Sequence, residues 1–375
     1  MHPAPRCEVA LPQPARPSHR RPRDAREALA PGVRCRGVLP LSVLDLATVA
    51  TDSSPAQALA ETTRLAGEVE ALGYRRLWVA EHHAMPAVAS SAPPVLVAHL
   101  AAATSTLRVG AGGVMLPNHA PLVVAEQFAT LDALHPGRID LGIGRAPGTD
   151  PATARALRRT ADLGADRFPD DVVELLSYLV DEGPERHPAP VPGRGHLPEV
   201  WLLGSSTFSA QLAGLLGLPF SFAYHFAPRL VDEALAAYRS TFRPSRFLER
   251  PHAMVAASVL CAPDEEEARW LAGPSAVTVL QLRTGRLTPV VTPEEAAAVP
   301  MSPAERAAVE EATATHLVGD PGQVATGLRA LAARTDADEL MISTRAHAYG
   351  PRARSLRLVA EAWGLEPVHP QPTGA

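Results

Sequence analysis

The sequence predicts a (β/α)8 barrel, in which eight parallel strands alternate with helices. Three observations lead to this fold. Eight short, nearly continuous apolar segments read as strands that are buried on both faces, helical segments separate them, and polar residues cluster directly after the strands. A doubly wound open sheet is the competing arrangement. The count of eight strands and the polar strand ends favour the barrel.

The expected strands are rich in Leu, Val, Ile and aromatic residues. They span residues 39–44, 76–81, 107–116, 138–144, 200–205, 220–225, 252–261 and 339–344. Helices are expected near residues 55–72, 92–103, 121–134, 168–182, 207–216, 228–242, 303–314, 321–333 and 351–363. The first helix has the clearest ends, because Ser54 and Gln57 form a capping-box pattern around Pro55, and Gly73 follows the last turn.

Two long insertions are expected, one after the fourth strand at about 146–167 and one after the seventh at about 262–302. Loops that follow the strands of a barrel lie on its active face, so both insertions are placed to shape or cover a pocket.

Composition limits the class of protein. The chain has 375 residues, 46% of them apolar, which is enough for a sizeable core and excludes a disordered chain. The formal net charge of −5 argues against nucleic acid as a partner. Nothing reads as a membrane span or an export signal, and three distant cysteines give no disulfide framework, so we expect a cytoplasmic protein.

The two ends of the chain differ from its body. Residues 1–37 contain eight arginines and seven prolines but only three acidic residues, which predicts a disordered Arg/Pro-rich extension. The expected barrel domain spans residues 38–366, and residues 367–375 form a short C-terminal tail.

In a barrel, the carboxyl ends of the strands converge on one mouth. In this chain the residues at or directly after these ends are Glu81-His82-His83, Gly110-Ala111-Gly112-Gly113, Leu116-Pro117-Asn118-His119, Gly142-Ile143-Gly144-Arg145, Gly204-Ser205-Ser206, Tyr224-His225 and Arg345-Ala346-His347.

The clearest of these sites is Gly204-Ser205-Ser206. A strand, a tight turn and a helix start leave free N–H groups and the positive end of a helix dipole, which suit a phosphate. Ser206 can cap that helix, Ser209 lies one turn on, and Arg145 can add a positive charge. The alternatives are an ordinary cap for Ser206 and an ordinary salt bridge for Arg145.

Two other patterns are weaker. The glycines from Gly142 to Gly148 have the wrong spacing for a dinucleotide fingerprint, and Pro147 opposes the required helix, so no nicotinamide site is expected. Glu81, His82 and His83 are possible metal ligands, but neighbouring strand residues face opposite sides. His82 and His83 therefore should not both point inward, and we predict no metal site.

At these residues the sequence resembles the bacterial luciferase-like flavin-dependent monooxygenases, and it is most similar to their short single-chain branch. The resemblance covers about residues 39–363 and rests on WVAEHH at 78–83, on the segment from LRVGAGGVMLPNHAP to GRAPG at 107–148, and on the Gly204-Ser205-Ser206 turn. It implies a (β/α)8 barrel that binds reduced FMN, or in one branch a deazaflavin, at the mouth.

The resemblance also implies roles for single residues. His82 matches the catalytic histidine, and Gly112-Gly113 matches a non-prolyl cis peptide bond beneath the flavin ring. Arg145, Ser206 and Ser209 match residues that contact the flavin phosphate. The chain departs from luciferase at Ser205, where luciferase has an acid, and at Gly144, where it has a reactive cysteine. The predicted cofactor-binding set is Glu81, Gly112, Gly113, Arg145, Ser205, Ser206 and Ser209, with His82 as catalytic residue.

The expected function is therefore a monooxygenase that uses reduced FMN and O2 on a small organic substrate. A separate reductase would supply the reduced flavin, and the family implies a homodimer. Three alternatives remain at this point: a deazaflavin-dependent dehydrogenase or reductase, a metal-dependent barrel hydrolase that uses the histidines, and a non-enzymatic flavin-binding protein.

Overall fold

The computed structural model describes residues 38–146, 151–158, 166–180, 190–192 and 196–368. The predicted extension at 1–37 and residues 369–375 of the predicted tail lie outside the described residues. The amide of Val368 donates a hydrogen bond to the carbonyl of Ala71 at 3.1 Å, so the packed chain continues past the expected domain end at residue 366.

Nine parallel strands form one sheet, and eight of them close into a barrel. The order is β6-β5-β4-β3-β2-β1-β9-β7, and pairing between β6 and β7 closes the ring. This confirms the predicted barrel and excludes the open sheet. The barrel strands are β1 (Leu41–Asp45), β2 (Arg76–Val79), β3 (Arg108–Met115), β4 (Ile139–Gly144), β5 (Glu199–Gly204), β6 (Phe220–Phe222), β7 (Ala253–Cys261) and β9 (Glu339–Ser343).

The ninth strand, β8 (Leu317–Gly319), was not predicted. It pairs only with the end of β7, at Val259–Cys261, and so lies outside the ring.

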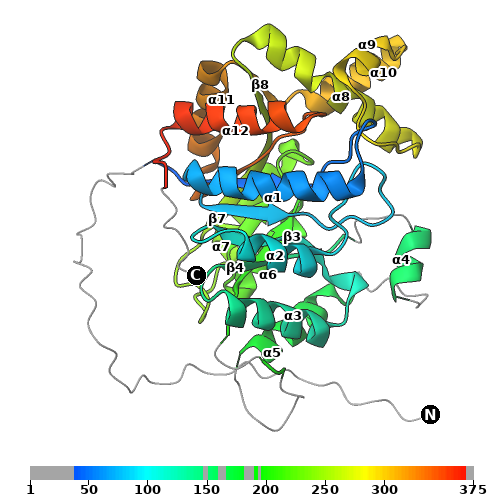
Figure 1. The fold of residues 1–375 in the computed structure, drawn as a ribbon. Coiled ribbons are helices and arrows are strands. Elements are labelled where there is room, and N and C mark those ends of the chain that lie inside the picture. The colour runs from blue at the N-terminus through cyan, green and yellow to red at the C-terminus, as the bar shows by residue number, and fades with distance from the viewer. Residues whose placement is uncertain (1–37, 147–150, 159–165, 181–189, 193–195, 369–375) are drawn as a thin grey trace, which may run out of the picture. The chain divides into compact units, whose positions relative to one another are not determined.

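Helices connect the strands and cover the outside of the barrel (Figure 1). They are α1 (Pro55–Ala71), α2 (Pro93–Ala102), α3 (Pro121–Leu134), α4 (Pro151–Arg158), α5 (Phe168–Leu179), α6 (Thr207–Leu216), α7 (Val231–Thr241), α8 (Glu265–Thr284), α9 (Pro293–Ala298), α10 (Pro303–Thr313), α11 (Pro321–Thr335) and α12 (Tyr349–Trp363). Among the described residues, no helix has the length and apolar character needed to cross a membrane.

The first helix follows its sequence signals with one difference. Ser54 accepts a hydrogen bond from the amide of Gln57, as expected of an N-cap. The side chain of Gln57 bonds to Glu61 instead of turning back, so only half of the predicted capping box forms. Gly73 has a φ of +82°, and a Cβ there would lie 2.1 Å from the carbonyl oxygen of Glu366. Glycine is therefore required where the C-terminal segment crosses the end of α1.

Both predicted insertions contain helices that the sequence reading missed. Helix α4 lies in the first insertion, and α8 and α9 lie in the second. Figure 1 shows α8, α9 and α10 gathered together in yellow beyond one end of the barrel.

Inward-facing side chains fill the lower barrel in two layers. The floor is charged: Arg76 donates to Asp140 at 2.7 Å and to Glu339 at 2.8 Å, and all three side chains are fully buried. Two residues further along their strands, an apolar layer covers this floor. Its members are Leu44, Trp78, Trp201, Met254 and Met341. The period of two along each strand means that the next inward positions lie at the mouth, where the site must form.

Candidate active site

A cavity of about 210 Å³ lies above the tryptophan layer, at the carboxyl ends of the strands. Residues from β1 to β7 and from β9 contribute to it, as expected of a barrel mouth. Seven of the eight predicted site residues line it: His82, Gly112, Gly113, Arg145, Ser205, Ser206 and Ser209.

A second cavity, of about 350 Å³, adjoins the first. Leu46, His82, Phe226 and Arg345 line both cavities and so mark the junction between them. The outer wall comes from α8 and the segment after it, which confirms that the predicted insertion after β7 helps to form a pocket.

The predicted phosphate site lies at one side of the first cavity, where β5 leads into α6. Ser206 occupies the N-cap position, yet its side chain makes no capping hydrogen bond, so its hydroxyl is not used by the helix. Arg145 stacks on the ring of Phe208, with its guanidinium carbon 4.6 Å from the ring centroid. A Cβ on Gly204 would lie 2.4 Å from the Cβ of Ser209, so glycine lets α6 start close against the strand. The start of α6, the two serine hydroxyls and the Arg145 guanidinium therefore all face the same cavity.

The Gly112–Gly113 peptide bond is cis, as the resemblance implied. The pairing of β3 with β4 shifts register between Ala111 and Val114, so the strand bulges at this bond. A Cβ on Gly112 would lie 2.9 Å from the ring of Trp78, and one on Gly113 would lie 2.8 Å from the carbonyl oxygen of Gly142. The two glycines therefore let the backbone itself form this wall of the cavity.

His82 stands at the junction of the two cavities. Its amide donates to the carbonyl of Ser90 at 3.1 Å, which fixes the backbone, while its ring atom Nδ1 is buried and has no hydrogen-bond partner in the described part of the chain. Burial, and then the positive charge of Arg345, lower the pKa of His82 to about 4. The ring is therefore neutral near pH 7 and has a hydrogen-bonding atom available to a ligand.

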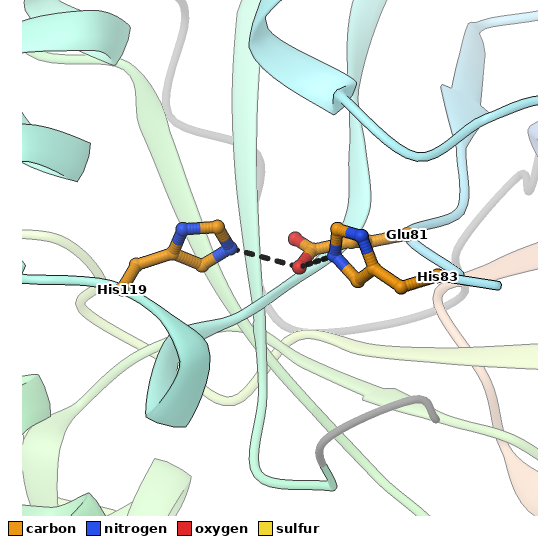
Figure 2. A group of neighbouring side chains, drawn as sticks. All are labelled: Glu81, His83 and His119. Atoms are coloured by element: carbon orange, nitrogen blue, oxygen red, sulfur yellow. Dashed lines mark hydrogen bonds and ion pairs between the residues drawn. The ribbon is translucent and has the colours of Figure 1, made fainter. Parts of the chain in front are cut away.

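Glu81 is placed differently from the other predicted residues, because it does not line either cavity. It is fully buried, and its Oε1 accepts hydrogen bonds from Nε2 of His83 and Nε2 of His119, each at 2.8 Å. The two imidazoles reach this oxygen from different segments (Figure 2). Its Oε2 accepts from the amide of Met115 at 3.0 Å. Burial alone would raise the pKa of Glu81, but these hydrogen bonds hold it below its ordinary value.

Glu81 thus joins the end of β2 to the end of β3, and it positions the segment that carries His82. Among the described residues, Glu81, His83 and His119 also form a group whose ligand atoms lie within 4.8 Å of one another, as a metal site would require. The hydrogen bonds already account for their arrangement, and the absence of a metal stays a prediction.

The structure places His82 and His83 differently. Strand β2 ends at Val79, so strand alternation does not extend to these residues; His82 lines both cavities, whereas His83 lines only the second. His225 and Arg345 also line the first cavity. Their position after predicted strands indicated the mouth, but no pattern in the sequence indicated a role for either residue.

Fold and cavities define a (β/α)8-barrel enzyme with its site at the carboxyl ends of the strands. The profile of the luciferase-like monooxygenases matches residues 39–338, and the chain belongs to this family of oxidoreductases. A protein named luciferase-like monooxygenase from Escherichia coli (strain K12) is 46% identical over 320 residues, which cover 85% of this chain and 96% of that protein. The similarity read from the sequence is confirmed.

Solved structures have the same fold. The crystal structure of apo-MsnO8 is 35% identical, has a TM-score of 0.82, and aligns over 88% of this chain and 100% of that chain. Two more distant chains share the fold. The oxygenating constituent of 3,6-diketocamphane monooxygenase of Pseudomonas putida, in complex with FMN, is 18% identical with a TM-score of 0.63 over 89% of this chain and 100% of its own. An F420-dependent secondary alcohol dehydrogenase is 15% identical and has a TM-score of 0.58; the alignment covers 87% of this chain and 99% of that chain.

Proposed function

We propose that this enzyme uses reduced FMN and O2 to oxygenate a small organic substrate, and that a separate reductase supplies the reduced flavin. The observation that carries the proposal is the first cavity itself. One side of it offers an anion site at the start of α6, and its interior offers a flat backbone wall and an unpartnered histidine atom. These are the two kinds of surface that a phosphorylated flavin needs.

The phosphate side fits a dianion. Ser206 and Ser209 present hydroxyls that make no hydrogen bond within the described residues, and the first N–H groups of α6 are open. Arg145 makes no ion pair with a described carboxylate, so its charge is available to a ligand phosphate. Ser205, where the resemblance placed an acid in luciferase, adds no negative charge here.

The ring side fits a planar heterocycle. The Gly112–Gly113 backbone forms one wall, and apolar side chains surround it, among them Leu44, Leu203 and Met115. Such walls exclude water, which protects reactive species from hydrolysis and proton leakage. When bound, reduced FMN would supply the two electrons with which O2 places one oxygen atom on the substrate and leaves the other as water.

His82 would serve the reaction by holding or moving a proton at Nδ1. It lies between the cavity assigned to the flavin ring and the one that remains for the substrate. Burial keeps its ring neutral, so Nδ1 can either donate or accept a hydrogen bond, according to tautomer.

Activity can be tested with a flavin reductase that supplies reduced FMN to the purified protein. Oxygen consumption that exceeds the reductase's own background and rises with a turned-over substrate supports the proposal. Binding of FMN without any such turnover would indicate a non-enzymatic flavin-binding protein. Hydride transfer from a reduced deazaflavin without O2 uptake would make the enzyme a dehydrogenase or reductase.

The phosphate assignment predicts a selective loss in the Arg145→Ala variant. Its affinity for FMN should fall about 10- to 100-fold, because a charge-assisted hydrogen bond contributes about 1.5–3 kcal/mol, while its affinity for riboflavin should hardly change. Fluorescence titration measures both. The matched control is Arg269→Ala, whose side chain is exposed and paired with Glu265 on α8. Equal weakening of FMN and riboflavin would contradict the assignment.

We also propose a cytoplasmic homodimer that pairs through α2 and α3. Both helices carry exposed apolar side chains: Val95 is 72% exposed, Val123 is 46% exposed and Leu134 is 65% exposed. Light scattering at micromolar concentration should report a dimer, and Val95→Glu combined with Val123→Glu should give a folded monomer. A wild-type monomer would contradict this part of the proposal.

A further inference from the structure

Arg345 follows β9 on the inward side of the barrel. Glu339 and Met341 face inward from this strand, in the charged floor and in the tryptophan layer, and Arg345 lies two residues past the carboxyl end of the strand at Ser343. Its side chain lines both cavities and stands at their junction with His82. The residue therefore faces the place where a substrate would meet the cofactor.

The guanidinium of Arg345 has no counter-charge among the described residues. It makes no hydrogen bond or ion pair with any of them, and its Nε is buried without a partner. Two fully buried arginines differ from it, since Arg76 is paired with Asp140 and Glu339, and Arg352 is paired with Glu61. Arg345 is half-buried, and its guanidinium, with the buried Nε, is left for a ligand to satisfy.

The ionisable groups whose pKa values respond to the charge of Arg345 add no negative charge. They are the imidazoles of His82, His225 and His316, and the pKa of each is lowered to about 4, first by burial and in part by Arg345 itself. All three rings are thus neutral near pH 7. A positive site surrounded by neutral rings selects an anion.

The lining of the second cavity indicates the polarity of the rest of that ligand. Most of its lining is apolar, and the polar side chains include His82, His83 and Arg345. The apolar lining includes Leu46, Met85, Val88, Phe226, Leu282 and Val290. Such a cavity suits a ligand with a large apolar part and one charged group, which would contact Arg345 at the junction with the first cavity.

We propose that Arg345 binds the carboxylate of the substrate, and that the apolar part of this organic acid fills the second cavity. The proposal rests on the monooxygenase function proposed above and names the substrate class. A carboxylate matches the fork of donors on a guanidinium and can accept two hydrogen bonds at once.

The cofactor phosphate is a poor candidate for the same charge. Its proposed site lies after β4 and β5, whereas Arg345 follows β9, which is separated from β4 by β1, β2 and β3 and from β5 by β7 and β6. Arg145, Ser205, Ser206 and Ser209 line the first cavity but not the second. The two cations thus serve opposite sides of the mouth.

Calorimetric titration of the flavin-free protein tests the proposal with two probes of similar shape, phenylbutyrate and phenylbutanol. The wild type should bind the acid at least about tenfold more tightly than the alcohol. Arg345→Gln should remove this preference and leave the affinity for the alcohol unchanged, while Arg345→Lys should keep part of it. The control is Arg286→Gln, an exposed arginine next to the cavity residue Leu287, which should keep the full preference.

Several results would overturn the proposal. The wild type could bind phenylbutyrate no more tightly than phenylbutanol, or it could fail to bind phenylbutyrate at all. The preference for the acid could also survive in Arg345→Gln. Reduced FMN is titrated into the same variants. A loss of FMN affinity in Arg345→Gln with an unchanged acid preference would assign Arg345 to the cofactor instead. If the wild type fails to bind reduced FMN but keeps an Arg345-dependent preference, the proposed function fails and the acid site stands.

Discussion

The His82→Ala variant is expected to bind reduced FMN as the wild type does and to lose about 10²–10⁴-fold in turnover, the usual contribution of a general acid or base. His82 lies at the junction of the two cavities, and its Nδ1 has no partner among the described residues. Removal of its ring therefore deletes the proton-carrying group without touching the proposed phosphate site. Flavin titration and oxygen consumption measure the two properties separately.

His83→Ala is the natural comparison. The ring of His83 bonds to Glu81, so its loss should lower thermal stability more than turnover. An exchange of the two phenotypes, with turnover lost in His83→Ala and kept in His82→Ala, would mean that the catalytic role belongs to His83.

The occupied site should also change the acid–base behaviour of His82. Burial is the larger cause of its low pKa, and the charge of Arg345 is the second. A carboxylate bound to Arg345 would offset the second cause and bring the pKa of His82 closer to the range in which general acids and bases work best. Substrate binding and proton transfer would then be coupled through one arginine.

The Arg76→Met variant is expected to lose about 3–5 kcal/mol of unfolding free energy, as when one partner of a buried ion pair is removed. Arg76 lies between Asp140 and Glu339 in the barrel floor, and all three are buried. Burial alone would raise the pKa of Glu339, but Arg76, together with His252 and Ser42, lowers it to about 2. Without Arg76, an ionised carboxylate would remain in the barrel interior with fewer partners.

Urea unfolding followed by tryptophan fluorescence measures this loss, because Trp78 and Trp201 lie directly above the floor. Arg269→Met is the control. Its ion pair with Glu265 is exposed to solvent, and such pairs contribute no more than about 1 kcal/mol. If Arg76→Met unfolds at the same urea concentration as the control, the charged floor does not stabilise the barrel.

The sequence was sufficient for the barrel because each strand and helix carries its own local signal. Apolar runs and capping residues are local, and the eight barrel strands were all found. The missed elements carry conflicting signals or are short, although α8 and α9 have capping residues at Asp264 and Thr292. Helix α8 contains Pro274 in its interior, which usually ends a helix, and β8 has only three residues. Helices α4 and α9 are likewise short, with eight and six residues.

Seven of the predicted site residues line one cavity because a barrel brings every strand end to one mouth. Glu81 was assigned to the cofactor, but its actual partners include His119, which is 38 positions away and whose contact no local pattern indicates. The role of Arg345 was not predictable either. The lack of a counter-charge is a property of the folded arrangement, since it depends on every neighbour that the fold brings near.

We expect the first cavity to hold reduced FMN by its phosphate and its ring. The decisive measurement is an anaerobic equilibrium titration of the purified protein with reduced FMN, reduced riboflavin and a reduced deazaflavin cofactor. Reduced FMN should bind saturably, riboflavin should bind clearly more weakly, and the deazaflavin should bind no more strongly than FMN. Failure of reduced FMN to bind, or tighter binding of the deazaflavin, would overturn the assignment of this cavity to FMN.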